Sequence, residues 1–528
     1  MTTVGLISII DVCADAAKVP FAALTLAVCV YCALKTAQLK CRGPEGGLAN
    51  IVPWLALALV AAAVIRIFLY PHNAGLMNDD FYLAQSARRM IDPAFNPINK
   101  FDVPAGWPLI VSISFWVNGI DQYAMFYANA IIGCLSAVAL FYLVYGATGR
   151  LAAAVVSAFF LALSPLHSLW STSGSGDIAA AFFMVVSIAA LFWFFRLHYV
   201  ELIFLSMYAA SFASQISAEN LLLFAAIPAA IFLFSKELFV PRMVARNLVF
   251  PTILTLPAVV NGLMAYTAKA AAVGADSVFA KAGIVGTVVN NLADYISAAA
   301  GERFFVFVLI IAAVGLSAGL KKDSRAILFF VALGAAYLVA SGIFLGNAAY
   351  MERLLLNTEI MLIAIIGFGV KSVVEKRPKL RVPMMAAGLI LAVALSYGSH
   401  ADNLAHDNDY FAYGREITNI INWVNEELPS NSTLIVEDPS PYQFSTRTNV
   451  ITPGMAAAFA GDLPPEANVY MIVDISAQGI PGDVCGLFDL EMIKRIDVSQ
   501  PIKPCGFDLG AYLVKAINSN QKDRSESK

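Results

Sequence analysis

Charged residues are what this sequence has least of. Only 13% of its 528 residues are Asp, Glu, Lys or Arg, whereas a soluble domain carries about 25%. Hydrophobic residues make up 59% of the chain and the mean hydropathy is +0.72. This shortage of polar surface excludes most soluble folds, and a net charge of −3 is unlike that of a nucleic-acid binder. The composition therefore predicts a polytopic membrane protein with one small soluble domain.

Several sequence motifs are also missing. There is no phosphate-binding glycine loop ending in Gly-Lys, no Gly-x-Gly-x-x-Gly after a strand and no Gly-x-Ser-x-Gly, which argues against nucleotide use and a serine hydrolase. No His, Asp and Glu cluster has metal-ligand spacing, so no cofactor is predicted, although a divalent metal at Asp79 and Asp80 stays possible. The first residues lack a basic region and a cleavage site, so no cleaved signal peptide is expected.

The seven cysteines divide into two groups. Five lie in or near apolar segments, where small thiols usually serve as packing residues. Cys485 and Cys505 stand alone in the polar C-terminal region. They form either a disulfide, if that region is outside the cytoplasm, or two buried thiols.

Long apolar runs are the dominant positive feature. A spanning helix needs about 20 mostly apolar residues, and this criterion predicts an all-α membrane domain of about twelve spans. We expect these spans at 19–37, 50–70, 123–145, 150–168, 176–196, 200–214, 218–235, 247–268, 304–320, 326–345, 353–371 and 383–399.

Loop charges predict the orientation of these spans. Alternate short connectors contain the basic groups of 35–42, 236–246, 321–325 and 371–381, together with Arg150 and Arg196. The opposite connectors are longer and hold far fewer basic residues, so the first set is expected on the cytoplasmic side of the inner membrane. The active site, both termini and the tail are then expected outside the cytoplasm.

Three regions are predicted to lie outside the cytoplasm. Two are the loops 71–122 and 269–303 of the transmembrane domain, which comprises residues 1–399, and the third is the tail 400–528. Residues 107–118 in the first loop are apolar but too short to span, which suits a helix on or in the membrane surface. Residues 400–528 read as an α/β domain, with a helix at 413–427 and strands within STLIVED, NVYMIVDI and AYLVKAI.

The first outer loop contains two adjacent acids, Asp79 and Asp80, just beyond a membrane exit. A carboxylate there is a candidate general base or metal ligand. The alternative is helix capping, because acids at a helix start complement its dipole. Capping does not explain the proline-rich and aromatic remainder of the loop.

A family resemblance rests on four segments. They are the acidic pair with Tyr82 and the following Gly-Trp-Pro-Leu, residues 161–183 with an acid opening a helix after Ser-Pro, residues 346–362 with Arg353, and the start of the tail at 415–438. Together they resemble the GT-C superfamily of membrane glycosyltransferases, in the branch of the dolichyl-phosphate-mannose protein mannosyltransferases and the lipid A aminoarabinose transferase.

The resemblance implies transfer of a sugar from a polyprenyl-phosphate donor to a lipid, glycan or protein acceptor of the cell envelope, with inversion at the anomeric carbon. Asp79 is the first choice of catalytic base and Asp80 its partner or alternate. The remaining candidates divide by the group that they would bind. The donor phosphate would be bound by Arg353, Lys281, Arg303 and Lys269, and the sugar or acceptor by Asp177, Tyr82, Trp107 and Glu219.

Each candidate also has an ordinary explanation. The basic residues are otherwise loop charges or snorkelling side chains, the acids are helix-start residues, and the aromatics belong to an interfacial belt. Two rival functions stay open. One is a transporter or flippase, which the number of spans would suit. The other is a ligase or polymerase that uses diphosphate-linked glycans.

Overall fold

The computed structural model describes most of the predicted helices. The described residues are 3–37, 48–70, 78–95, 104–235, 249–256, 259–260, 303–344, 355–405, 409–429, 431–436, 442, 449–452, 455, 468–474, 488–496 and 509–516. They divide into two compact units. The first comprises 1–72, 102–114 and 125–406, and the second comprises 73–101, 115–124 and 407–528. Each unit is described by itself below.

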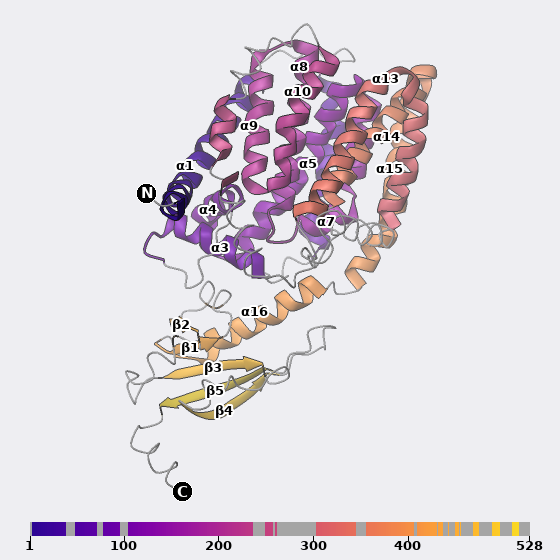
Figure 1. Ribbon diagram of the computed structural model, residues 1–528. Helices are drawn as coiled ribbons and strands as arrows, with labels where there is room; N and C mark the ends of the chain where they lie inside the picture. Colours follow the sequence, from indigo (N-terminus) through magenta and orange to yellow (C-terminus); the bar gives the residue numbers. More distant parts are fainter. Residues whose placement is uncertain are drawn as a thin grey trace, which may run out of the picture. The chain divides into compact units, whose positions relative to one another are not determined.

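The first unit is a bundle of apolar helices (Figure 1). Its elements before the 261–302 gap are α1 (Thr3–Ala37), α2 (Leu48–Ala63), the π-helix η1 (Val64–Leu69), α5 (Gln122–Thr148), α6 (Leu151–Ala162), α7 (Pro165–Trp170), α8 (Asp177–Leu197), α9 (Val200–Ile216), the 3₁₀ turn η2 (Ala218–Leu221) and α10 (Leu222–Phe234). After it come α13 (Arg303–Phe344), α14 (Leu356–Lys376), the 3₁₀ turn η5 (Pro378–Leu380) and α15 (Arg381–Ala405). α4 (Gly106–Asn118) also begins in this unit.

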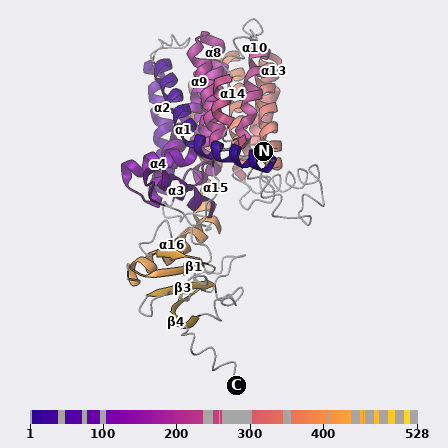
Figure 2. The same cartoon turned by 60° about the vertical axis from the view of Figure 1, so that its left-hand side comes forward.

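Eight helices in the described residues are long and apolar enough to cross a membrane, so the chain is a multi-pass membrane protein. α13 supplies two of them, because its backbone leaves the helical conformation at Asp323. α6, α9 and the segment 218–234 are shorter apolar helices. α14 packs against α13 and α6, and α8 packs against α9, so buried helices form the centre of the bundle (Figures 1 and 2).

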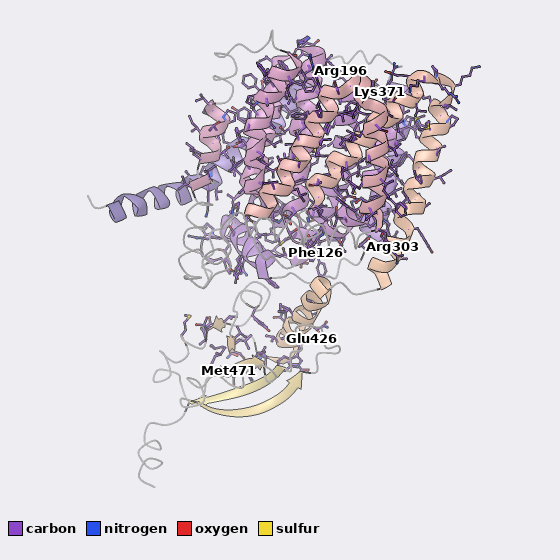
Figure 3. The ribbon with its side chains drawn as sticks, turned by 45° about the vertical axis from the view of Figure 1, so that its right-hand side comes forward. Phe126, Arg196, Arg303, Lys371, Glu426 and Met471 are labelled. Atoms are coloured by element: carbon purple, nitrogen blue, oxygen red, sulfur yellow. The ribbon has the colours of Figure 1, made fainter. Side chains whose placement is uncertain are left out.

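Four labelled residues distinguish the two ends of the bundle. Arg196 and Lys371 lie at one end, and Phe126 and Arg303 lie at the other (Figure 3). Two ion pairs connect helix ends near the first group, Lys371 with Asp323 at 2.7 Å and Arg150 with Glu375 at 3.3 Å. We refer to the opposite end as the Arg303 end.

The second unit contains the helices α3 (Asn78–Ile91) and α16 (Asp409–Glu427) and a mixed five-stranded sheet. The strands are β1 (Thr433–Val436), β2 (Asn449–Ile451), β3 (Val469–Asp474), β4 (Phe488–Ile496) and β5 (Leu509–Ala516), in the order β2-β1-β3-β5-β4. β1 runs parallel to both neighbours, whereas β5 is antiparallel to β3 and β4. Leu434 and Ile435 on β1, an interior strand of the sheet, are fully buried.

The observed elements differ from the predicted ones in two informative places. The span expected at 150–168 is broken, because α6 ends at Ala162 and Ser164 caps a separate helix that begins with Pro165. In the tail, the strands β2 and β4 add to the three that were predicted. The count of twelve spans and the domain boundary at 399/400 stay predictions, and most of the span 247–268 lies outside the described residues.

Candidate functional site

Buried polar side chains gather at the Arg303 end of the first unit. Asp177 opens α8 and Arg196 lies in its last turn, so Asp177 is at the end opposite Arg196. By the same reasoning Asn357, in the first turn of α14, lies at the end opposite Lys371. Three groups of hydrogen bonds are found at this end.

The first group surrounds Arg66, a fully buried arginine in the π-helix η1. Its five N–H groups are all used. Their acceptors are Ala62 O at 3.2 Å, Ala162 O at 2.8 Å, Leu161 O at 3.3 Å, Ser171 Oγ at 3.2 Å and His167 Nδ1 at 2.9 Å. A buried guanidinium needs this complete set, because an unmatched donor is costly away from water. Arg66 therefore ties η1 to the junction between α6 and α7.

That junction exists because of Pro165. Proline lacks an N–H group, so the carbonyls that end α6 need other donors. Arg66 supplies them for residues 161 and 162, and His400 Nε2 lies 3.0 Å from Leu163 O. His400 Nδ1 in turn lies 2.7 Å from the Tyr70 hydroxyl. Side chains from α15 and from the end of η1 thus meet at one break in a helix.

Ser164 extends the same junction to α14. Its hydroxyl accepts from the backbone N–H of His167 at 3.0 Å and donates to Glu359 Oε1 at 2.8 Å. Glu359 is fully buried in the first turn of α14. The helix cap of α7 is therefore also a contact between helices.

The second group holds the turn that leads into Asp177. Trp107 Nε1 donates to Gly174 O at 2.8 Å. Asn129 Nδ2 lies within hydrogen-bond distance of three carbonyls in the same turn, at Trp170, Ser173 and Ser175. Residues 171–175 are buried, although all of them are serine, threonine or glycine. The turn is thereby fixed from α4 and α5, and it determines where α8 and Asp177 begin.

The third group joins η2 to α13 and α14. Asn357 Nδ2 donates to Glu219 Oε1 at 3.1 Å. The Tyr337 hydroxyl donates to Asn220 Oδ1 at 2.9 Å. Glu219 and Asn357 are more than nine-tenths buried, and Asn220 and Tyr337 are completely buried. The predicted acid Glu219 is thus held by a hydrogen bond to α14.

The structure brings together only some of the residues that the sequence singled out. In the first unit Trp107 contacts the turn before Asp177, Glu219 bonds to Asn357, and Arg303 is exposed at the start of α13. In the second unit Asp80 is 1% exposed and Tyr82 is half-buried, both on α3. The roles of all these residues stay predictions.

Four predicted residues cannot be placed in this way. The side chain of Asp79 is outside the described part of the structure, although its backbone belongs to α3. Arg353, Lys281 and Lys269 lie entirely outside the described residues, as do Cys485 and Cys505.

α3 also contains Arg88, whose described contacts are with residues close to it in the sequence. The Arg88 guanidinium lies 4.2 Å from the centre of the Phe95 ring. Burial lowers the pKa of Arg88 below its usual value, and the nearby Asp92 carboxylate acts in the opposite direction. The region after Asp80 is therefore partly withdrawn from solvent.

Sequence reasoning missed five polar residues of the Arg303 end. They are Arg66, Asn129, Asn357, Glu359 and His400. Each lies inside or beside an apolar span, and a polar group at such a position is costly unless it has partners. That rule could have selected all five. No group of three His, Cys, Asp or Glu side chains suited to a metal occurs in the described residues.

Comparison with solved structures identifies the fold. No family model matches the chain. ArnT from Cupriavidus metallidurans bound to undecaprenyl phosphate superposes with a TM-score of 0.60 at 12% identity, covering 90% of this chain and 99% of ArnT. ArnT in the apo state gives a TM-score of 0.58 at 13% identity, covering 88% and 97%.

The chain therefore has the fold of a GT-C membrane glycosyltransferase, which confirms the resemblance at the level of the fold. ArnT, the lipid A aminoarabinose transferase, shares this fold over nearly its whole length. A curated relative, an uncharacterized protein of Aquifex aeolicus, is 23% identical over 163 residues. That match covers 30% of this chain and 33% of the relative.

Proposed function

We propose that this protein transfers a sugar from a polyprenyl-phosphate donor to an acceptor of the cell envelope. The observation that supports the proposal is the fold shared with ArnT over 90% of the chain, since that ArnT structure contains undecaprenyl phosphate. A fold alone does not define an activity, so the proposal also relies on the two acids of the first outer loop.

In the proposed reaction an acceptor hydroxyl attacks the anomeric carbon of the sugar while polyprenyl phosphate leaves from the opposite face. The bond formed is between the acceptor oxygen and carbon, and the bond broken is between that carbon and the phosphate oxygen. The proton of the hydroxyl goes to a carboxylate. Asp79 or Asp80 takes this role, and the burial of Asp80 suits a general base in a water-poor site.

The leaving phosphate develops charge, which fixed cations stabilise. Arg303 is a candidate within the described residues, because it is exposed at the start of α13. Arg353, Lys269 and Lys281 are the other candidates. Asp177, Glu219, Tyr82 and Trp107 would bind sugar or acceptor. No resident metal or other cofactor forms part of the proposal.

The finer topology belongs to the same proposal. In this proposal the protein crosses the inner membrane twelve times. The Arg196 end, with its basic connectors, faces the cytoplasm, and the Arg303 end faces the outer side. Residues 400–528 then form an α/β domain on the outer side. A lipid-linked donor stays in the bilayer, so an enzyme with this substrate needs a membrane-embedded site that opens to the acceptor.

The test is a transfer assay with the purified full-length protein in lipid nanodiscs. The donors are undecaprenyl phosphate carrying mannose, glucose or 4-amino-4-deoxyarabinose, and the acceptor is an envelope lipid extract. We expect protein-dependent release of undecaprenyl phosphate from at least one donor, measured by mass spectrometry. No release from any donor, together with proton-coupled uptake into vesicles, would favour a transporter and overturn the proposal.

A further inference from the structure

Glu219 and Asn357 form a buried pair whose amide orientation can be assigned. The pair lies at the Arg303 end, where η2 meets the first turn of α14. A carboxylate accepts hydrogen bonds and does not donate them, so the group of Asn357 that faces it must be Nδ2. The amide oxygen Oδ1 therefore points away from Glu219.

That oxygen has no hydrogen-bond partner among the residues that the structure describes, although it is buried. The whole Asn357 side chain is only 6% exposed. A buried carbonyl oxygen without a donor is unfavourable, and such atoms are rare in folded proteins. Asn357 Oδ1 is thus positioned to accept a hydrogen bond from a group outside the described residues.

The pair is held rigidly by its neighbours. Asn220, next to Glu219, uses Nδ2 to bond the carbonyl of Ser217 at 3.3 Å and Oδ1 to accept from Tyr337 at 2.9 Å. These contacts fix the η2 turn against α13. Thr358, next to Asn357, bonds to Gly334 O at 3.4 Å and connects α14 with α13. Both residues of the pair therefore have preset positions, which lowers the cost of binding a ligand.

We propose that Glu219 and Asn357 recognise the hydroxyl groups of a sugar, a role that rests on the proposed function. A carboxylate and an amide carbonyl are both acceptors, and a sugar hydroxyl is the neutral donor that suits them. A carboxylate can accept several hydrogen bonds, so the bond from Asn357 does not prevent Glu219 from accepting another. The sugar is either that of the donor lipid or that of the acceptor glycan.

The test compares three variants of the full-length protein. Asn357→Leu removes the buried acceptor, and Glu219→Gln keeps the shape but removes the charge. Ser372→Ala is the control, since Ser372 also joins α14 to α13, through Ala318 O at 3.1 Å, but lies beside Lys371 and far from the pair. Binding of bare undecaprenyl phosphate and of undecaprenyl phosphate mannose is measured by thermophoresis. The KM values for donor and acceptor are measured in the transfer assay.

We expect Asn357→Leu and Glu219→Gln to raise one KM value about tenfold or more, because a site built for hydroxyl groups discriminates strongly. If the donor supplies the sugar, binding of the mannose-linked lipid weakens while that of bare undecaprenyl phosphate is unchanged. If the acceptor supplies it, only the KM for the acceptor rises. Ser372→Ala should alter neither the binding nor the KM values.

The outcomes separate the two proposals. Wild-type transfer together with unchanged binding and KM values in both variants would overturn this inference and leave the proposed function standing. Equal weakening of bare and mannose-linked lipid would also overturn it, because it indicates phosphate or prenyl contacts. Absence of transfer by the wild-type protein would overturn both.

Discussion

The guanidinium of Arg66 donates through Nη2 to Nδ1 of His167 at a distance of 2.9 Å, across 101 residues of sequence. Because the arginine can only donate, Nδ1 must accept, which places the imidazole proton on Nε2 and leaves the ring neutral. A neutral imidazole avoids a second positive charge beside the buried Arg66. The pair fixes the end of α2 and η1 against α7.

Replacing Arg66 should destabilise the first unit. Arg66→Leu removes five hydrogen bonds, among them the one to the buried Ala162 carbonyl, so we expect the free energy of unfolding to fall by about 3 kcal/mol. Thermal unfolding in detergent measures the change. Arg325→Leu is the control, since this exposed arginine bonds only to Leu233 O in the described structure. Equal effects of both substitutions would contradict the structural role of Arg66.

Gly133 on α5 should be intolerant of a side chain. A Cβ atom there would meet the Ser171 hydroxyl, lie 2.7 Å from Ser171 Cβ and lie 3.1 Å from Arg66 Nε. We expect Gly133→Ala to lower the free energy of unfolding by about 1–3 kcal/mol through overpacking. Gly398→Ala on α15 meets nothing within 4 Å. It should be neutral or stabilising by about 1 kcal/mol, since alanine favours the helix.

A substitution at Trp107 tests whether its indole N–H holds the turn that precedes Asp177. Trp107→Phe keeps an aromatic ring but loses the donor to Gly174 O. We expect a loss of about 1 kcal/mol in unfolding free energy and increased hydrogen exchange confined to residues 171–177. If exchange in this turn stays at the wild-type level, the indole does not hold the turn. Unchanged stability with a weakened donor affinity would instead favour the predicted role in ligand stacking.

The acidic pair is tested by two amide substitutions. Asp79→Asn and Asp80→Asn each keep the side-chain size while removing the basic oxygen. At least one should reduce transfer by a factor of about 10² or more, as expected for loss of a general base, with unchanged expression and thermal stability. Asp121→Asn is a control in the same outer loop, where this exposed acid accepts from the backbone of Tyr123. Full activity in both variants would contradict the assignment.

The helices were largely predictable because apolar length is a local property. Residues 176–196 were expected to span, and α8 is Asp177–Leu197. The expected tail helix at 413–427 corresponds to α16, which begins four residues earlier, at Asp409. β4 was missed, although Phe488, Leu490 and Met492 alternate with the acids Asp489 and Glu491 in a pattern typical of an edge strand.

The contacts of the Arg303 end were not predictable because they join distant parts of the chain. Tyr70 and His400 are 330 residues apart, and Asn357 and Glu219 are 138 apart. Helical periodicity indicates which face of a helix is apolar, but it does not show which helix ends meet. The break at Pro165 was visible in the sequence, whereas the side chains that satisfy its carbonyls belong to helices whose packing is a property of the whole fold.

The π-helical turn of η1 has a consequence for the permissible length of this segment. The backbone N–H of Tyr70 bonds to Ile65 O at 3.2 Å, so the turn contains one residue more than an α-helix would. Deleting any single residue between Val64 and Leu69 would let the helix close in the ordinary way. The residues that follow would keep nearly their present phase, because the extra residue is confined to the π turn, so Tyr70 would still face His400. A one-codon deletion here, of any residue but Arg66, would thus be tolerated, whereas the same deletion within α2 would rotate every following residue of the helix by about 100°.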